Sequence, residues 1–172
     1  WDKRQPPHKP VQEKQLGERV FAMDGNAGFF VAATADNKLH CIDASTQLLH
    51  GPTITYDSPC KYQTRVVRMF EDTKDPGFGV GTIEGRVALE YMSEVAKKTP
   101  QGARSNKNFV FKCHRDKVGG STFIYSVNDL AFHPIYNTLA TAGSDGKLVI
   151  WDKDSRHRKS EYDRFKVGSQ QF

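Results

Sequence analysis

A cysteine next to a histidine, Cys113-His114, is the first combination in the chain whose residue types could do chemistry. A thiol activated by an imidazole is a common catalytic nucleophile. The surrounding residues predict a strand, however, and adjacent residues of a strand point to opposite faces of the sheet. The two side chains then cannot pair directly, so the sequence gives a hydrolase little support.

Histidines and glycines offer two further enzymatic patterns, and neither has the context it needs. His114, His133 and His157 lack the spacing of zinc ligands and have no partner cysteine cluster. The glycine-rich run over residues 77–81 could suggest a nucleotide loop, but it lies within a strand pattern with no helix after it. We therefore expect no metal, no other cofactor and no enzymatic activity.

The composition bounds the class of protein. The chain has 172 residues, a net charge of +5 and a pI near 9.1, which favours acidic partners. No run approaches the roughly 18 apolar residues of a membrane span, so we expect no membrane partner. Cys41, Cys60 and Cys113 are an odd number without CxxC spacing, which fits a reducing compartment.

Internal repetition is the most informative feature of the chain. Each repeat has a short apolar strand, a turn, a strand of small residues, an acidic turn and a second apolar strand. The acidic turns tolerate positive φ, as tight hairpins require, and they are Asp36-Asn37, Glu84-Gly85 and Asp145-Gly146. The pattern predicts an all-β fold with units over about residues 18–56, 60–113 and 114–166.

Two polar stretches account for the uneven spacing of the repeats. Residues 92–108 contain almost no apolar side chains, and residues 117–122 contain Gly119-Gly120. Both compositions are typical of surface loops or of a disordered insertion between strands.

The third repeat resembles a blade of a WD-repeat propeller. Its small-residue strand ends in Ser-Asp-Gly, and its next strand ends in Trp151-Asp152, whereas the other two repeats lack the Trp-Asp pair. Trp1-Asp2 resembles the end of an earlier blade. In such blades four polar side chains form a buried hydrogen-bond network, so the resemblance implies a structural role for His114, Thr141, Asp145 and Trp151.

Five motifs give a closer likeness, and they are residues 81–88, 111–115, 125–128, 132–134 and 151–154. Their order resembles that in the nuclear-pore messenger-RNA export factors (the Rae/Gle family) and in the paralogous mitotic-checkpoint Bub protein. Residues 132–134 and 151–154 favour the export factors, whereas residues 61–65 and 87–91 favour the checkpoint protein.

The resemblance implies a seven-bladed propeller without enzymatic activity that binds a GLEBS segment, an acidic and hydrophobic peptide. The peptide belongs to a nucleoporin in the export family and to checkpoint kinases in the other. Arg86 matches the best-marked peptide-contacting arginine, and its planar fork suits a carboxylate. Lys61 and Arg65 are further candidates for this site.

The expected role is that of a scaffold for messenger-RNA export in the nucleus, at the nuclear pore and in the cytoplasm. A spindle-checkpoint role at kinetochores is the alternative, and a generic WD-repeat subunit of another complex is a third hypothesis.

A second site, on the rim, is implied by aromatic and basic residues, namely Phe111, Lys112, Trp151, Arg156 and Arg158. An aromatic ring beside several cations can stack a base and hold phosphate, so single-stranded RNA is a candidate partner. Trp151 also belongs to the expected network, so a buried ring is the competing interpretation.

Three units are too few to close a propeller, which takes about 4–8 blades. The length therefore predicts part of a larger ring. Because an open arc leaves unpaired strand edges, we also expect this chain alone to self-associate or to need a partner.

Overall fold

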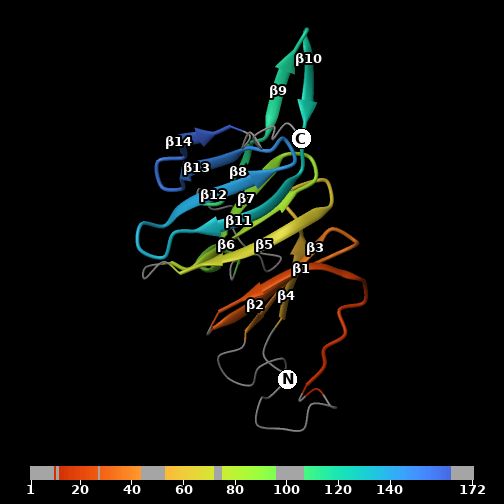
Figure 1. Ribbon diagram of the computed structural model, residues 1–172. Coiled ribbons are helices and arrows are strands. Elements are labelled where there is room, and N and C mark those ends of the chain that lie inside the picture. Colours follow the sequence, from red (N-terminus) through yellow and green to blue (C-terminus); the bar gives the residue numbers. More distant parts are fainter. Residues whose placement is uncertain are drawn as a thin grey trace, which may run out of the picture.

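Three four-stranded antiparallel sheets form the body of the described part of the chain (Figure 1). The computed structural model describes residues 10, 12–26, 28–43, 53–71, 75–95 and 107–163. The all-β prediction is confirmed, since α1 (Met92–Val95) is the one helix in these ranges. Trp1-Asp2 lies outside the described residues.

The sheets follow one another along the chain, and in each the strands pair in sequence order. Sheet 1 contains β1 (Val20–Gly25), β2 (Phe29–Thr34), β3 (Lys38–Asp43) and β4 (Thr53–Asp57). Sheet 2 contains β5 (Thr64–Phe70), β6 (Gly77–Thr82), β7 (Arg86–Tyr91) and β8 (Phe109–Lys112). Sheet 3 contains β11 (Val127–Phe132), β12 (Thr138–Gly143), β13 (Leu148–Asp152) and β14 (His157–Tyr162).

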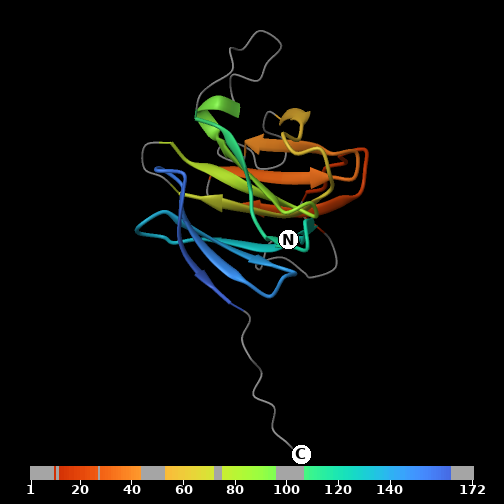
Figure 2. The same cartoon turned by 90° about the horizontal axis from the view of Figure 1, so that it is seen from above.

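The sheets are stacked face to face, with sheet 2 between the other two (Figure 2). The first strands pack side by side, β1 against β5 and β5 against β11. Each of these first strands carries a register shift where it pairs with its neighbour. Four-stranded sheets in this succession are the blades of a propeller.

The core lies between the sheets in two layers. Leu39, Val67 and Val80 belong to the layer between sheets 1 and 2, and Val87 and Leu139 to the layer between sheets 2 and 3. Every residue of β6 is buried, because this strand is covered on both faces. Glycine at 79 allows this close approach, since an added Cβ would lie 3.1 Å from the ring of Phe132.

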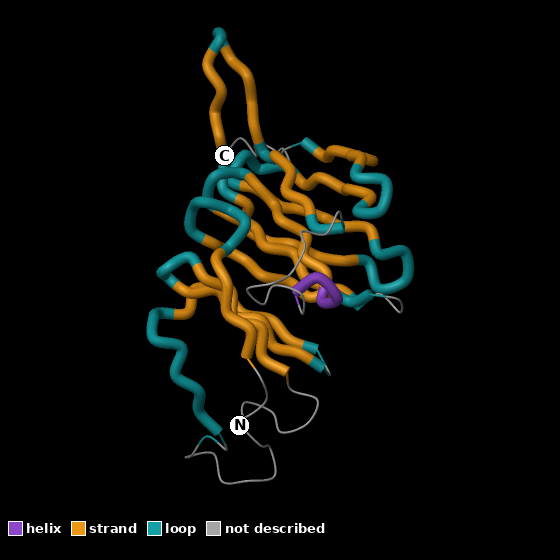
Figure 3. The backbone as a smooth tube through the Cα atoms, turned by 180° about the vertical axis from the view of Figure 1, so that it is seen from behind, coloured by secondary structure: helices purple, strands orange, loops and turns teal. Residues whose placement is uncertain are grey.

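A β-hairpin replaces the loop or disordered segment that the composition of residues 117–122 predicts. It is formed by β9 (Arg115–Val118) and β10 (Ser121–Ile124), and it projects away from the three sheets (Figure 3). Gly119 and Gly120 form its turn with φ of 57° and 83°, values that glycine adopts without strain. The prediction was wrong because polar composition was given more weight than the Gly-Gly turn, which favours a tight hairpin.

The polar stretch 92–108 begins with a helical turn instead of a loop. Asp75 accepts hydrogen bonds from the backbone N and Oγ of Ser93 and from Lys107 Nζ, so it ties both ends of the stretch to sheet 2. Burial opposes ionisation of Asp75, but these hydrogen bonds prevail and lower its pKa. Residues 96–106 lie outside the described ranges, and no helix within those ranges is long or apolar enough to cross a membrane.

Candidate functional site

A buried hydrogen-bond network lies in sheet 3 at the end nearest the hairpin. The side of the molecule from which the hairpin projects is called the top face (Figure 1). His114 Nδ1 is 2.9 Å and 3.0 Å from the two carboxyl oxygens of Asp145, and its Nε2 is 2.9 Å from Thr141 Oγ1. Trp151 Nε1 donates to the same hydroxyl oxygen at 3.0 Å. With the imidazole proton on Nδ1, every group in the series Trp151–Thr141–His114–Asp145 has a partner.

The local backbone explains how His114 reaches Asp145. His114 follows β8 rather than lying within a strand, and its φ is +49°, so it turns its ring back under the turn between β12 and β13. In the sheets that precede it, threonine stands at the last position of the second strand, as Thr34 and Thr82 do. Sheet 3 has Gly143 there, and the ring of His114 occupies the space that a side chain would take.

The hydroxyl, imidazole and carboxyl groups of this network have the order of a catalytic triad, but they cannot act as one. Thr141, His114 and Asp145 are all buried, with Thr141 fully so, and no substrate could reach the hydroxyl. Cys113 is no better as a nucleophile, because burial raises the pKa of its thiol to about 12. The chemistry of these residues is therefore structural.

Arg86 lies at the start of β7, at the edge of the top face. Its Nε is 3.1 Å from Glu84 Oε2 in the preceding turn, and its side chain is 36% exposed. Its partner in the strand register is Lys112 on β8, so the two cations share one face of sheet 2. The guanidinium keeps free donors that could meet an incoming carboxylate.

Lys61 and Arg65 lie before and at the start of β5, at the same end of sheet 2 as the turn that precedes Arg86. Lys61 is exposed in the connection from β4 to β5, with its ammonium 5.8 Å from the ring of Tyr62. Arg65 is exposed where β5 bulges away from its register with β6. Both side chains are therefore accessible on the top side of the molecule.

The aromatic part of the predicted rim is assembled between β8 and β13. The rings of Phe111 and Trp151 are 4.7 Å apart, and the guanidinium carbon of Arg156 lies 4.5 Å from the ring of Phe109. These four side chains line a cleft of about 260 Å³. Trp151 is partly exposed, so one ring serves both roles that the sequence left open, with its N–H in the network and its face in the cleft.

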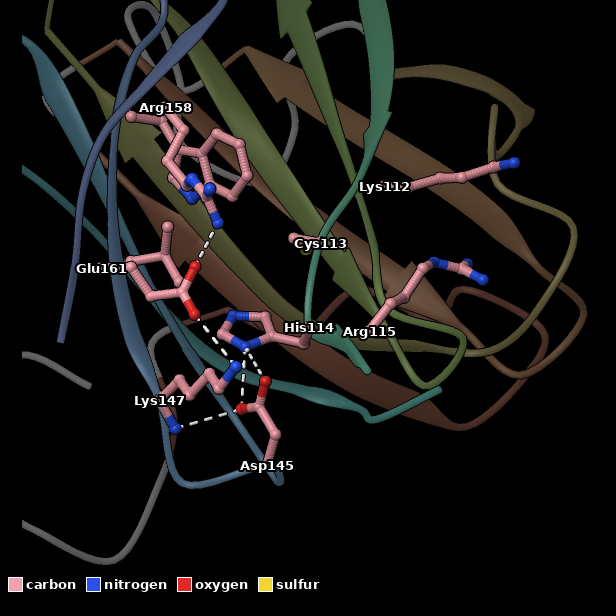
Figure 4. A pocket seen from close by; sticks show the side chains of 10 residues that line it. Lys112, Cys113, His114, Arg115, Asp145, Lys147, Arg158 and Glu161 are labelled. Atoms are coloured by element: carbon pink, nitrogen blue, oxygen red, sulfur yellow. Dashed lines mark hydrogen bonds and ion pairs between the residues drawn. The ribbon is translucent and has the colours of Figure 1, made fainter. Parts of the chain in front are cut away.

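The structure separates Lys112 from this cleft. Phe111 turns toward Trp151, so the next residue on the strand turns to the opposite face. Figure 4 shows the Lys112 side chain directed away from Arg158, on the same side as Arg115. The resemblance implies a place for Lys112 in the rim, and Lys112 lines a second cavity, beside the buried network, together with Trp151 and Arg158.

An ion-pair series that sequence reasoning did not predict joins the hairpin to sheet 3. Lys147 Nζ is 3.1 Å from Asp116 of β9 and 2.9 Å from Glu161 of β14. Glu161 also pairs with Arg158 (Figure 4). The hydrogen bonds to Glu161 and Asp116 raise the pKa of Lys147, and the bond from Lys147 lowers the pKa of Glu161.

Phe109 is the other functional candidate that sequence reasoning missed. It alternates with Phe111 along β8, and that spacing of two was the available signal.

Among the described residues no group of three or more histidine, cysteine or acidic side chains could hold a metal ion.

Known proteins similar to this chain include curated messenger-RNA export factors. The chain is 39% identical over 165 residues to the Poly(A)+ RNA export protein of Schizosaccharomyces pombe, covering 94% of this chain and 42% of that protein. It is 42% identical over 152 residues to the mRNA export factor of Xenopus tropicalis, covering 86% and 39%. It is also 38% identical over 164 residues to the WD40 repeat protein poxJ of Penicillium oxalicum, covering 94% and 44%.

Solved structures resemble the chain in fold alone. U3-55K aligns with a TM-score of 0.65 at 12% identity, over 89% of this chain and 42% of that one. Chaetomium thermophilum Raptor aligns with a TM-score of 0.60 at 12% identity, over 88% and 12%. No protein-family model matches the chain.

The chain spans about two fifths of the length of the curated relatives that it matches. The names of these relatives agree with the export branch of the resemblance. The three sheets have the fold of propeller blades, and nearly the whole chain is similar in sequence to proteins named as messenger-RNA export factors.

Proposed function

We propose that this chain is part of a non-enzymatic WD-repeat scaffold that acts in messenger-RNA export in the nucleus, at the nuclear pore and in the cytoplasm. The main support is sequence similarity: the chain is 39% and 42% identical, over 94% and 86% of its length, to two proteins named as RNA export factors. Three blades in about two fifths of the relatives' length also fit a ring of about seven.

The top face of this scaffold binds a GLEBS-type peptide of a nucleoporin. Arg86 is the central contact, because its side chain is partly exposed, is fixed at the start of a strand and is accompanied by Lys112 on the same face. Lys61 and Arg65 extend the positive surface at the same end of sheet 2. A carboxylate of the peptide would compete with Glu84 for the guanidinium.

Calorimetric titration of a GLEBS peptide into the protein tests this function. We expect saturable binding by the wild type and a loss of at least about tenfold in affinity for Arg86→Glu, since reversing one partner of a hydrogen-bonded charge pair is costly. Lys159→Glu, an exposed reversal on β14, is the matched control and should bind as the wild type does. Equal affinities for the wild type and Arg86→Glu would refute the proposed site.

Single-stranded RNA is a second candidate ligand, and the cleft between β8 and β13 favours it. Phe111 and Trp151 offer ring faces, with Arg156 beside them and Arg158 on the neighbouring strand. Stacking of one base is worth about 1–3 kcal/mol, and phosphate contacts make binding fall with salt. A salt-independent affinity, or equal affinity for Arg156→Ala and the wild type, would reject this site.

A further inference from the structure

The hairpin of β9 and β10 exposes three apolar side chains to solvent. Val118 is 62% exposed, Phe123 51% and Ile124 49%, although β9 and β10 have no other strand beside them in the described part of the chain. A two-stranded hairpin is only marginally stable by itself in water. Exposed apolar side chains of this kind are typical of a surface that a binding partner covers.

The two faces of the hairpin differ in chemistry. Residues directly opposite each other share a face, and Lys117 pairs with Thr122 as Arg115 pairs with Ile124. This first face is basic, and Arg115 Nη2 donates to the backbone oxygen of Glu84 at 2.8 Å, so the face adjoins the surface of Arg86.

The second face carries Phe123 opposite Asp116 and Val118 opposite Ser121, so two of its four side chains are apolar. Ile124 lies on the first face, opposite Arg115. Lys147 engages the carboxylate of Asp116 at 3.1 Å, so the one acidic group of this face is neutralised by an ion pair to sheet 3. The rings and methyl groups of Phe123 and Val118 remain exposed.

We propose that the hairpin binds an extended peptide as an added strand, and that the peptide alternates acidic with apolar side chains. Successive side chains of a strand point to opposite faces. A strand added at the free edge of β9 therefore places every second residue beside Arg115 and Lys117, and the others on the face of Val118, with Phe123 one strand further on. Unpaired backbone groups at that edge supply the hydrogen bonds of strand addition.

This inference rests on the proposed peptide-binding function and extends its footprint from Arg86 along the hairpin. The same acidic and apolar ligand satisfies both, because the basic face of the hairpin continues the surface formed by Arg86 and Lys112. The hairpin adds a requirement that Arg86 alone does not impose, namely the alternation of the two residue types.

The test uses two synthetic peptides of about ten residues, long enough to pass the hairpin. One alternates Glu with Leu, and the other has the same composition with all Glu residues first. Affinities are measured by fluorescence anisotropy for the wild type, Arg86→Glu, Lys117→Glu, Phe123→Ser and two controls, Lys159→Glu and Tyr136→Ser. The controls reverse an exposed charge and remove an exposed ring elsewhere on the surface.

We expect the alternating peptide to bind at least about tenfold more tightly than the block peptide. Phe123→Ser should weaken it about tenfold and Lys117→Glu about threefold, with both controls unchanged. If Arg86→Glu abolishes binding while both hairpin variants match the wild type, the hairpin inference fails and the proposed function stands. If the hairpin variants lose binding while Arg86→Glu does not, the hairpin site stands without Arg86. If the wild type binds neither peptide, the hairpin inference fails, and the GLEBS titration decides the proposed function separately.

Discussion

The acidic turns of sheets 2 and 3 occupy equivalent positions and are used in opposite ways. In sheet 2 Glu84 is partly buried, with 16% of its side chain exposed, and it pairs with the cation that follows the turn, Arg86, at 3.1 Å. In sheet 3 Asp145 is buried against His114, and the cation that follows the turn, Lys147, pairs with Asp116 and Glu161. One turn thus presents an arginine to a ligand, while the other anchors the structure.

The difference shows that the buried network is not what makes a blade. Sheet 2 has Val80 and Glu90 where sheet 3 has Thr141 and Trp151, yet its four strands pair in the same order. Apolar burial between the sheets therefore determines the architecture. The network of sheet 3 instead holds His114, the residue directly before β9, and so fixes where the hairpin begins.

Replacing the buried acid should have the largest effect on stability. Asp145→Ala leaves His114 Nδ1 and the backbone N of Lys147 without their partner inside the protein. We expect the free energy of unfolding to fall by about 2–4 kcal/mol, as unsatisfied buried groups cost about 1–3 kcal/mol each. Urea denaturation followed by tryptophan fluorescence measures the loss.

The matched control is Glu84→Ala in sheet 2. Its partner Arg86 is 36% exposed and can turn to water, so the loss should stay near or below about 1 kcal/mol. Equal losses for the two variants would contradict the contrast between the turns.

A methyl group at Gly143 should cost somewhat less. Its Cβ would overlap the ring of His114 and lie 2.7 Å from Asp145 Oδ1, so we expect a loss of about 1–3 kcal/mol from overpacking. The double variant Gly143→Ala/His114→Ala should lose less than the sum of the two single variants, because the ring is no longer there to clash. Additive losses would show that the glycine serves some other purpose.

The sequence predicted much of this molecule, and the parts it missed have a common cause. The blade pattern and the residues His114, Thr141, Asp145 and Trp151 were identified from local motifs, and the geometry places these four in one network. Pairing between distant segments was not visible. The hairpin depends on two glycines in a polar stretch, and the position of Lys112 depends on which face of β8 meets sheet 3.

Removing the indole N–H of Trp151 should destabilise the protein less than Asp145→Ala or Gly143→Ala does. Trp151→Phe loses the hydrogen bond to Thr141 Oγ1 but keeps a ring beside Phe111, so the expected loss is about 1–2 kcal/mol. A double-mutant cycle with Thr141→Val isolates the hydrogen bond from the packing. A coupling energy of zero would mean that the indole contributes by packing alone.

The surface series Asp116–Lys147–Glu161 should give the smallest effect, and pH reveals it. The hydrogen bond from Lys147 lowers the pKa of Glu161 in the folded protein below its usual 4.5. The ionised group therefore contributes stability that is fully present above about pH 5 and is lost as the pH falls through the folded pKa. We expect Lys147→Met to cost about 1 kcal/mol or less near pH 7.

That cost should shrink as the pH falls through the folded pKa of Glu161, below which Glu161 is protonated in both proteins. Hydrogen exchange should also show faster opening of β9 and β10 in Lys147→Met, because the variant removes the tether from Asp116 to sheet 3. Lys117→Met, at an exposed position on the same hairpin, should show neither change. A pH-independent cost would mean that Lys147 stabilises sheet 3 through its methylene chain, and the contrast with the turn of sheet 2 would then rest on Asp145 alone.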